Sequence, residues 1–307
     1  MALGELIFTL LGFCVILFCG VRLAHLLMML SPKVWNPLPE NFFTSKGKWA
    51  VITGGSDGIG KAYAQELARR GLNVVIISRT KEKLDGVARE IELKTEAKVR
   101  AIAADFTKDD IYRDIEENIE GLDIGLLVNN VGILPTQLPC KLLETANLEE
   151  KINQVINCNV KTMVKMCHIV LPGMVERGRG IVLNVSSGIA KIPCPTYALY
   201  AASKAFVERF SQGLLAEYRS SGILIQSVSP FGVSTTMTGH PKPDLITFTA
   251  EEFVRNSLMY LKTGEQTYGS VRHSILGWVI QAIPTWVLRS EAFHQHFQEY
   301  VKRRVCS

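Results

Sequence analysis

TGGSDGIG (residues 53–60) follows an apolar run and precedes a charged helical pattern. Its glycines, Gly54, Gly58 and Gly60 with Gly55 as an extra, do not have the G-x-G-x-x-G order of the dinucleotide-binding fingerprint. A turn between a strand and a helix still directs backbone N–H groups and the positive end of the helix dipole toward a pyrophosphate. The stretch therefore predicts a phosphate cradle with altered glycine spacing; a flexible turn is the alternative.

Short apolar runs alternate with helical patterns from Lys48 onward. Most runs are unbroken rather than alternating, as expected for strands that are covered on both faces. They cover residues 49–53, 73–78, 99–105, 124–130, 180–187 and 223–230. Helices of ordinary length lie between them, for example residues 61–71. This order predicts an α/β fold, a single Rossmann-type doubly wound parallel sheet with right-handed crossovers.

The composition is typical of a folded protein. Of 307 residues, 47% are hydrophobic and 21% are charged, which is sufficient for a packed core. The net charge of +5 is mild and spread along the chain, which argues against nucleic acid as a partner. The seven cysteines form no C-x-x-C pair and lack histidines at zinc spacing, so we expect reduced thiols and no metal site.

The N-terminus is predicted to be a membrane anchor. Residues 6–21 are continuously apolar, and residues 23–30 extend the run to the length of about 20 residues that a spanning helix needs. We expect an anchor over residues 1–30, a proline-rich linker over 31–47 and the Rossmann-type domain over 48–307. A cleaved signal peptide and a helix lying in the membrane surface are the alternatives.

Charges around the apolar run distinguish these alternatives and predict the topology. The leader carries Glu5 and no basic side chain, unlike a signal peptide. Arg22, His25 and Lys33 follow the core of the run. Because basic residues stay on the cytosolic side of a span, the domain over residues 48–307 is predicted to face the cytosol.

Residues 184–206 carry the predicted chemistry. Tyr200 and Lys204 are four residues apart, so they share one face of a helix. A free phenol has a pKa of about 10. A nearby ammonium and a positively charged nicotinamide both favour the phenolate, which would make Tyr200 a proton donor. Tyr197 is a rival phenol, but Ala201 stands four residues after it.

Several sequence motifs of this chain resemble those of the short-chain dehydrogenase/reductase family. They occur in the family's order and spacing between residues 48 and 236 and include its T-G-x-x-x-G-x-G spacing. The matching positions are residues 53–60, NNVG at 129–132, Asn159, Ser187, Y-x-x-x-K at 200–204 and PFGVST at 230–235. Two departures are mild, Val131 in place of the usual alanine and the inserted Phe231, because neither removes a functional group.

The resemblance implies the roles of four catalytic residues. Tyr200 protonates the carbonyl oxygen during reduction, and Lys204 lowers the pKa of Tyr200 and holds the nicotinamide ribose. Ser187 is the substrate-binding residue and hydrogen-bonds the carbonyl. Asn159 links Lys204 to a water relay.

The implied cofactor is NADP(H). The second strand ends in Ser78 and Arg79 with no acidic residue before Glu82, and the Arg79 guanidinium suits a 2′-phosphate. Asp105 resembles the family's acid near the adenine amino group. The cofactor-binding residues implied are Gly54, Ser56, Asp57, Gly58, Ile59, Gly60, Ser78, Arg79, Asp105, Asn130, Val131, Gly132, Tyr200, Lys204, Pro230, Val233 and Thr235.

Within the family, residues 47–80, 104–112, 122–135 and 184–190 are similar to the membrane-bound 17β-hydroxysteroid dehydrogenases. This implies a small lipophilic ketone as substrate, a 17-ketosteroid (androstenedione reduced to testosterone), and an endoplasmic reticulum membrane location. A very-long-chain 3-ketoacyl-CoA reductase is the alternative. A non-catalytic NADP-binding scaffold is the alternative of another class. A homodimer is common in the family, although no heptad or apolar stripe indicates one here.

Two further segments are predicted to shape the pocket. Residues 235–248 follow the sixth strand at the edge where substrate enters, so we expect a mobile lid. Residues 274–288 carry Trp278 and Trp286 but are too short and too interrupted for a confident span. They are either an ordinary buried C-terminal helix or a segment that covers the pocket and touches the bilayer.

Overall fold

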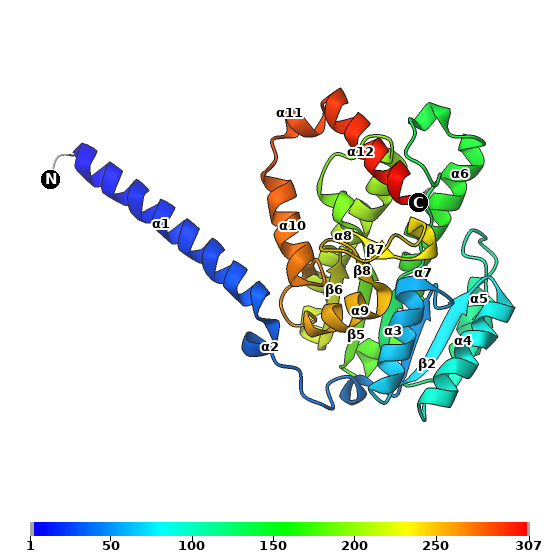
Figure 1. Cartoon of the computed structure of the whole chain (residues 1–307). Coiled ribbons are helices and arrows are strands. Elements are labelled where there is room, and N and C mark those ends of the chain that lie inside the picture. Colours follow the sequence, from blue (N-terminus) through cyan, green and yellow to red (C-terminus); the bar gives the residue numbers. More distant parts are fainter. Residues whose placement is uncertain (1–2, 306–307) are drawn as a thin grey trace.

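A seven-stranded parallel sheet forms the centre of the computed structural model, which describes residues 3–305 (Figure 1). The strand order is β3-β2-β1-β4-β5-β6-β9, and a separate pair joins β7 and β8. The strands are β1 Trp49–Thr53, β2 Asn73–Ser78, β3 Val99–Ala103, β4 Ile124–Asn129, β5 Gly180–Val185, β6 Ile223–Val228, β7 Val233–Ser234, β8 Phe248–Thr249 and β9 Gln266–Thr267. The predicted α/β, Rossmann-type doubly wound fold is confirmed.

Helices connect the strands and continue beyond the last one. They are α1 Leu3–Leu30, α2 Pro32–Trp35, α3 Gly58–Arg69, α4 Lys81–Lys94, α5 Tyr112–Ile119, α6 Leu148–Val155, α7 Thr162–Glu176, α8 Ala198–Tyr218, α9 Ala250–Met259, α10 Val271–Ala282, α11 Thr285–Leu288 and α12 Glu291–Val305. A π-helical turn, η3 Ile156–Lys161, separates α6 from α7. Short 3₁₀ turns are η1 Thr44–Lys46, η2 Leu142–Glu144, η4 Gly188–Lys191, η5 Arg219–Ser221 and η6 Thr236–Thr238.

The sheet is buried on both faces, which explains its unbroken apolar strands. On one face, Ala50 and Ile52 of β1 pack in one hydrophobic cluster with α3, α4 and α9. On the other face, Val51 packs with α5, α7 and α8. Side chains alternate between the faces of a strand, so both neighbours of Val51 point to the opposite layer.

The order of the strands determines where a ligand can bind. β1 pairs with β2 on one side and with β4 on the other, so the chain reverses its winding direction between β1 and β4. In doubly wound sheets, ligands bind outside the carboxyl ends of the strands at this switch point. The turn after β1 and residues 130–132 after β4 meet there.

Several boundaries differ from the predictions for simple physical reasons. α3 begins at Gly58, inside the glycine-rich stretch, because the Asp57 side chain accepts a hydrogen bond from Gly58 N (2.7 Å) and caps the helix. β7, β8 and β9 were not predicted, since two-residue strands are too short to show a periodic pattern.

The N-terminal helix is long and apolar enough to cross a membrane. α1 has 28 residues, and none of its most apolar window, Gly4–Val21, is buried within the protein. Figure 1 shows it extending away from the domain. The side chains of Arg22, His25 and Lys33, and all of Cys306, lie outside the described part of the chain.

The segment predicted as a linker ends inside the domain rather than before it. Phe42 and Phe43 are buried in the hydrophobic cluster on the α3 side of the sheet. Arg70 lies over the Phe43 ring, 4.9 Å from its centroid. The part of residues 31–47 after Pro39 is therefore packed against the enzyme domain.

The C-terminal segment is not an ordinary buried helix, which corrects one of the two expectations for residues 274–288. Trp278 in α10 and Trp286 in α11 are 58% and 76% exposed. Other side chains of α10 line the large pocket described below. The helix is therefore apolar on both its inner and its outer side.

Candidate active site

The glycine-rich turn has no room for side chains at its predicted positions. A Cβ on Gly60 would lie 2.1 Å from the Gly54 carbonyl oxygen, and one on Gly54, which has φ +70°, would lie 2.8 Å from Asn130 Nδ2. Gly58 has φ +52° and lies against the Thr235 side chain. Each glycine thus permits a close approach, which explains the altered spacing and fits a cradle for a dinucleotide phosphate.

A hydrogen-bond network holds this turn against the strand end of β4. Thr53 Oγ1 accepts from the backbone N–H groups of Asn130 (3.0 Å) and Val131 (3.1 Å). Asn130 Nδ2 donates to the Thr53 carbonyl oxygen (3.0 Å). The network therefore couples the turn to residues 130–132, including Gly132, which stands near the Lys204 ammonium.

The end of β2 carries the groups expected to choose between nicotinamide cofactors. Arg79 is exposed and lines the pocket, and the described residues include no ion-pair partner for it. Ser56 and Ser78 hydroxyls are 2.8 Å apart, which joins the glycine-rich turn to β2. Asp105 also lines the pocket, while its Oδ1 accepts from Thr107 N (3.1 Å), so it forms a turn as well.

Three of the predicted catalytic side chains come together from the end of β5 and from α8. Tyr200 and Lys204 lie one turn apart in α8, with the Lys204 ammonium 5.8 Å from the centroid of the Tyr200 ring. Ser187 follows β5 and lines the same pocket. Lys204 Nζ donates to the Val185 carbonyl oxygen (2.9 Å), which fixes the ammonium at the strand end.

Burial dominates the acid–base properties of the pair. It raises the pKa of Tyr200 to about 12, against a smaller lowering by a hydrogen bond with the Ser187 side chain. It lowers the pKa of Lys204 to about 8. The expected lowering of the Tyr200 pKa by Lys204 is therefore not supplied by the protein alone; a positively charged ligand beside the ring would act in that direction.

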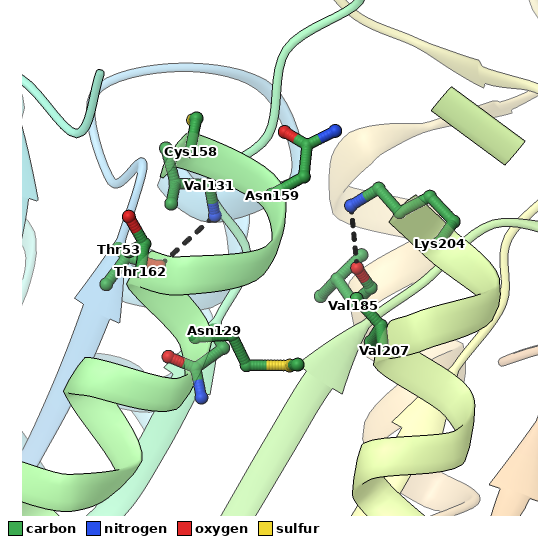
Figure 2. A pocket seen from close by; sticks show the side chains of 10 residues that line it. Thr53, Asn129, Val131, Cys158, Asn159, Thr162, Val185, Lys204 and Val207 are labelled. Carbon is green, nitrogen blue, oxygen red and sulfur yellow. Dashed lines mark hydrogen bonds between the residues drawn. The ribbon is translucent and has the colours of Figure 1, made fainter. Parts of the chain in front are cut away.

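Asn159 occupies the π-helical turn, where the extra residue per turn directs its side chain toward Lys204 (Figure 2). Its Oδ1 accepts from Ile133 N (2.8 Å), and its Nδ2 donates to the Ile133 carbonyl oxygen (3.0 Å) and to Ser203 Oγ (3.0 Å). Asn159 and Lys204 line a buried cavity of about 10 Å³. That volume is at the lower limit for one water molecule.

One large pocket contains most of the predicted site. Its volume is about 730 Å³, within the range of roughly 300–1,000 Å³ for ligand sites. Three of the predicted residues, Ser56, Gly60 and Asn159, do not line it. The predicted residues that line it are Gly54, Asp57, Gly58, Ile59, Ser78, Arg79, Asp105, Asn130, Val131, Gly132, Ser187, Tyr200, Lys204, Pro230, Val233 and Thr235.

The outer half of the pocket, farther from the glycine-rich turn, is formed by the predicted lid and the C-terminal helices. The sequence motifs did not indicate which side chains of these segments would line it. The segment predicted as a lid contributes Met237, Pro241 and Ile246. The C-terminal helices add apolar and aromatic side chains, namely Leu276, Ile280, Ile283, Phe293, Phe297, Tyr300 and Val301. Arg304 of α12 bonds Asp244 and Thr247 and so joins both walls. Opening and closing of the lid stays a prediction.

A partly buried ion pair supports the turn that follows Ser187. Lys191, in the 3₁₀ turn η4, lies 2.7 Å from the Glu208 carboxylate on α8. Ser229 Oγ donates to the same carboxylate (2.6 Å). Sequence reasoning missed Glu208, because its partner Lys191 lies in a different element and no local spacing links the two residues.

A second missed residue is His273, which is completely buried on α10. Phe231 N donates to its Nδ1 (3.4 Å), and its Nε2 lies 2.8 Å from the Ile246 carbonyl oxygen. Burial lowers the pKa of His273, so the neutral ring donates from Nε2. The Phe231 ring covers Gly188, beside Ser187, and His273 thereby positions both the inserted Phe231 and the predicted lid.

Fold and site together place the chain in one family of oxidoreductases. The sequence model described as short chain dehydrogenase matches residues 48–245, and the chain belongs to this family. A similar solved structure, a short-chain dehydrogenase from Sphingobium yanoikuyae in complex with NADPH, has 30% identity and a TM-score of 0.64, covering 71% of this chain and 86% of that one.

More specific similarity comes from curated relatives. The 17-beta-hydroxysteroid dehydrogenase type 3 of Danio rerio is 71% identical over 99% of both chains. The protein of the same name from Homo sapiens is 47% identical, covering 97% of this chain and 96% of its own. A very-long-chain 3-oxoacyl-CoA reductase from Macaca fascicularis is 44% identical over 84% of both chains.

Within residues 3–305, no group of three or more His, Cys, Asp or Glu side chains is arranged to hold a metal ion. The described cysteines, Cys14, Cys19, Cys140, Cys158, Cys167 and Cys194, are free thiols.

Proposed function

We propose that the chain reduces a 17-ketosteroid, androstenedione to testosterone, with NADPH and with Tyr200 as the proton donor. One observation carries the proposal: the Tyr200, Lys204 and Ser187 side chains border a pocket whose outer half is apolar and aromatic. A flat, lipophilic ketone fits such a lining. The relatives named 17-beta-hydroxysteroid dehydrogenase type 3 span nearly the whole chain, which supports the same substrate.

NADPH is proposed as cofactor because the site fits a phosphorylated dinucleotide. The glycine cradle leaves the backbone open to a pyrophosphate, and Arg79 is available for a 2′-phosphate. A bound NADPH supplies a hydride for the carbonyl carbon. The related structure from Sphingobium yanoikuyae was solved with NADPH, which supports this choice.

The chain's own residues would handle the proton and the carbonyl oxygen. Ser187 hydroxyl would donate a hydrogen bond to the carbonyl oxygen and polarise it, while Tyr200 transfers its proton to the same atom. The Lys204 ammonium, held by the Val185 carbonyl oxygen, would stabilise the phenolate that remains. Asn159 is proposed as a link for proton return, since it shares the small buried cavity with Lys204.

A very-long-chain 3-ketoacyl-CoA is the second candidate substrate, supported by relatives of that name. The charge of the pocket favours the steroid. Outside the cofactor's part, Arg304 is the one charged side chain in the described lining, and Asp244 already pairs with it. A coenzyme A phosphate group would require free cations.

The test is a comparison of both ketones with one preparation. Membranes containing the full chain are incubated with NADPH and either androstenedione or a 3-ketoacyl-CoA, and kcat/KM is measured for each. We expect the steroid to give the higher value. A higher value for the acyl-CoA would replace the proposed substrate with the second candidate, and no turnover of either would support the scaffold alternative.

Anchoring in the endoplasmic reticulum membrane, with the enzyme domain in the cytosol, is part of the proposal. α1 supplies the apolar length, and basic residues follow the span in the sequence. Homodimer formation stays a prediction.

A further inference from the structure

α10 has an outer apolar face that nothing in the described chain covers. Ile275, Trp278 and Val279 are 48%, 58% and 47% exposed, and Ala282 is exposed as well. Their spacing of i, i+3, i+4 and i+7 places them in one stripe along the helix. Trp286, just beyond in α11, is 76% exposed.

The charges around this stripe are arranged for an interface with lipid. No Asp, Glu, Lys or Arg occurs between Arg272 and Arg289, so the apolar stretch is flanked by one guanidinium at each end. Arg289 is exposed, and the Arg272 guanidinium is 3.7 Å from Glu252. Because Arg272 is paired with Glu252, Arg289 supplies the flanking positive charge. An amphipathic surface with tryptophans and a flanking cation suits the headgroup region of a bilayer.

The position of the stripe also points to lipid. The N-terminal helix α1, which is long enough to span a membrane, contacts α10. Figure 1 shows α10 on the side of the domain from which α1 departs. A membrane that receives α1 therefore meets the domain next to α10.

We propose that the outer face of α10 and α11, defined by Ile275, Trp278, Val279, Ala282 and Trp286, rests in the headgroup region of the bilayer that α1 enters. The inference rests on the proposed membrane anchoring. Because Leu276 and Ile280 of the same helix line the pocket, one helix then separates the lipid from the ketone site. A lipophilic ketone dissolved in the membrane would reach the pocket along this wall.

The test measures tryptophan fluorescence of the full chain in vesicles that contain lipids brominated on their acyl chains. Trp35 lies close to α1, so the measurement uses a W35F background. In that background Trp49, Trp278 and Trp286 emit. We expect quenching by the brominated lipids, its loss in W35F/W278F/W286F, and its retention in the matched control W35F/W49F, because Trp49 begins β1 in the sheet.

Vesicle flotation and NADPH-dependent turnover, measured on the same samples, separate the possible failures. Protein that floats with the vesicles but shows equal quenching in all three variants overturns the proposal and leaves the anchor intact. Protein that does not float overturns both. A second copy covers the face instead if quenching is absent and chemical cross-linking gives a dimer for the wild type but only a monomer for W278F/W286F. If the W35F protein is quenched by the brominated lipids but shows no NADPH-dependent ketone reduction, only the proposed reaction is contradicted.

Discussion

Tyr200 is the residue on which the proposed reaction depends, and its hydroxyl can be removed without changing the ring. Tyr200→Phe should lower kcat by about 10²–10⁴-fold, the usual contribution of a general acid. NADPH binding, measured by fluorescence titration, should change little because only the transferred proton is lost.

Tyr197→Phe is the matched control, since its ring lies 6.5 Å from that of Tyr200 but its hydroxyl donates to the Gln137 carbonyl oxygen (2.9 Å). Its effect on kcat should be much smaller. Activity of Tyr200→Phe within a few-fold of the wild type would remove Tyr200 from the mechanism.

Lys204 should give the reaction an upper pH limit. Burial lowers its pKa to about 8, whereas the pKa of Tyr200 is raised to about 12. As the pH rises through about 8, the ammonium loses its proton while Tyr200 remains a phenol, so stabilisation of the developing phenolate is lost. The kcat/KM for ketone reduction should fall above this pH. A profile that stays flat to about pH 10, with NADPH binding unchanged, would contradict this role for Lys204.

Arg79 should determine the choice of cofactor. A charge-assisted contact to a 2′-phosphate contributes about 1.5–3 kcal/mol, so Arg79→Gln should reduce the preference for NADPH over NADH by about tenfold or more. Lys81→Gln is the control, because Lys81 is exposed nearby and pairs with Asp85 (2.7 Å). An unchanged ratio of the kcat/KM values for the two cofactors would mean that another residue holds the phosphate.

At the scale of elements, the junction of β1 and α3 is the most sensitive point of the site. Gly60→Ala would place a methyl group 2.1 Å from the Gly54 carbonyl oxygen and force α3 away from the turn. Overpacking of this kind costs about 1–3 kcal/mol, and expressed at the cofactor site this cost lowers NADPH affinity by about 5- to 150-fold. Calorimetric titration measures this directly.

Gly86→Ala is the matched substitution in α4, where an added Cβ meets nothing within 4 Å. It should keep NADPH affinity and raise the free energy of unfolding by about 0.4–1 kcal/mol. Equal NADPH affinities of the two variants would show that the close approach of α3 does not shape the cofactor site.

The elements also show which parts of the site can be predicted from sequence. β1, β2, β4, β5 and β6 are strands of five or six mostly apolar residues, and the glycine cradle is continuous in sequence, so both are visible as local patterns. The pairing of Arg304 with Asp244, the contacts of His273 and the two-residue strand β9 depend on segments that meet only in the folded chain. No local periodicity reports such contacts.

At the scale of the whole molecule, the orientation in the membrane follows from the order of span and charge. Protease added to sealed microsomes should digest the enzyme domain and leave a short protected fragment that contains α1. Microsomes opened with detergent serve as the control for complete digestion. Full protection of the enzyme domain in sealed microsomes would place the active site in the lumen.

Transfer of a labelled hydride tests the central claim most directly. Membranes containing the full chain are given androstenedione and NADPH deuterated at the transferable position of the nicotinamide, and the product is analysed by mass spectrometry. The account predicts testosterone that carries one deuterium at the former carbonyl carbon. Absence of testosterone, or testosterone without the label, would contradict the account.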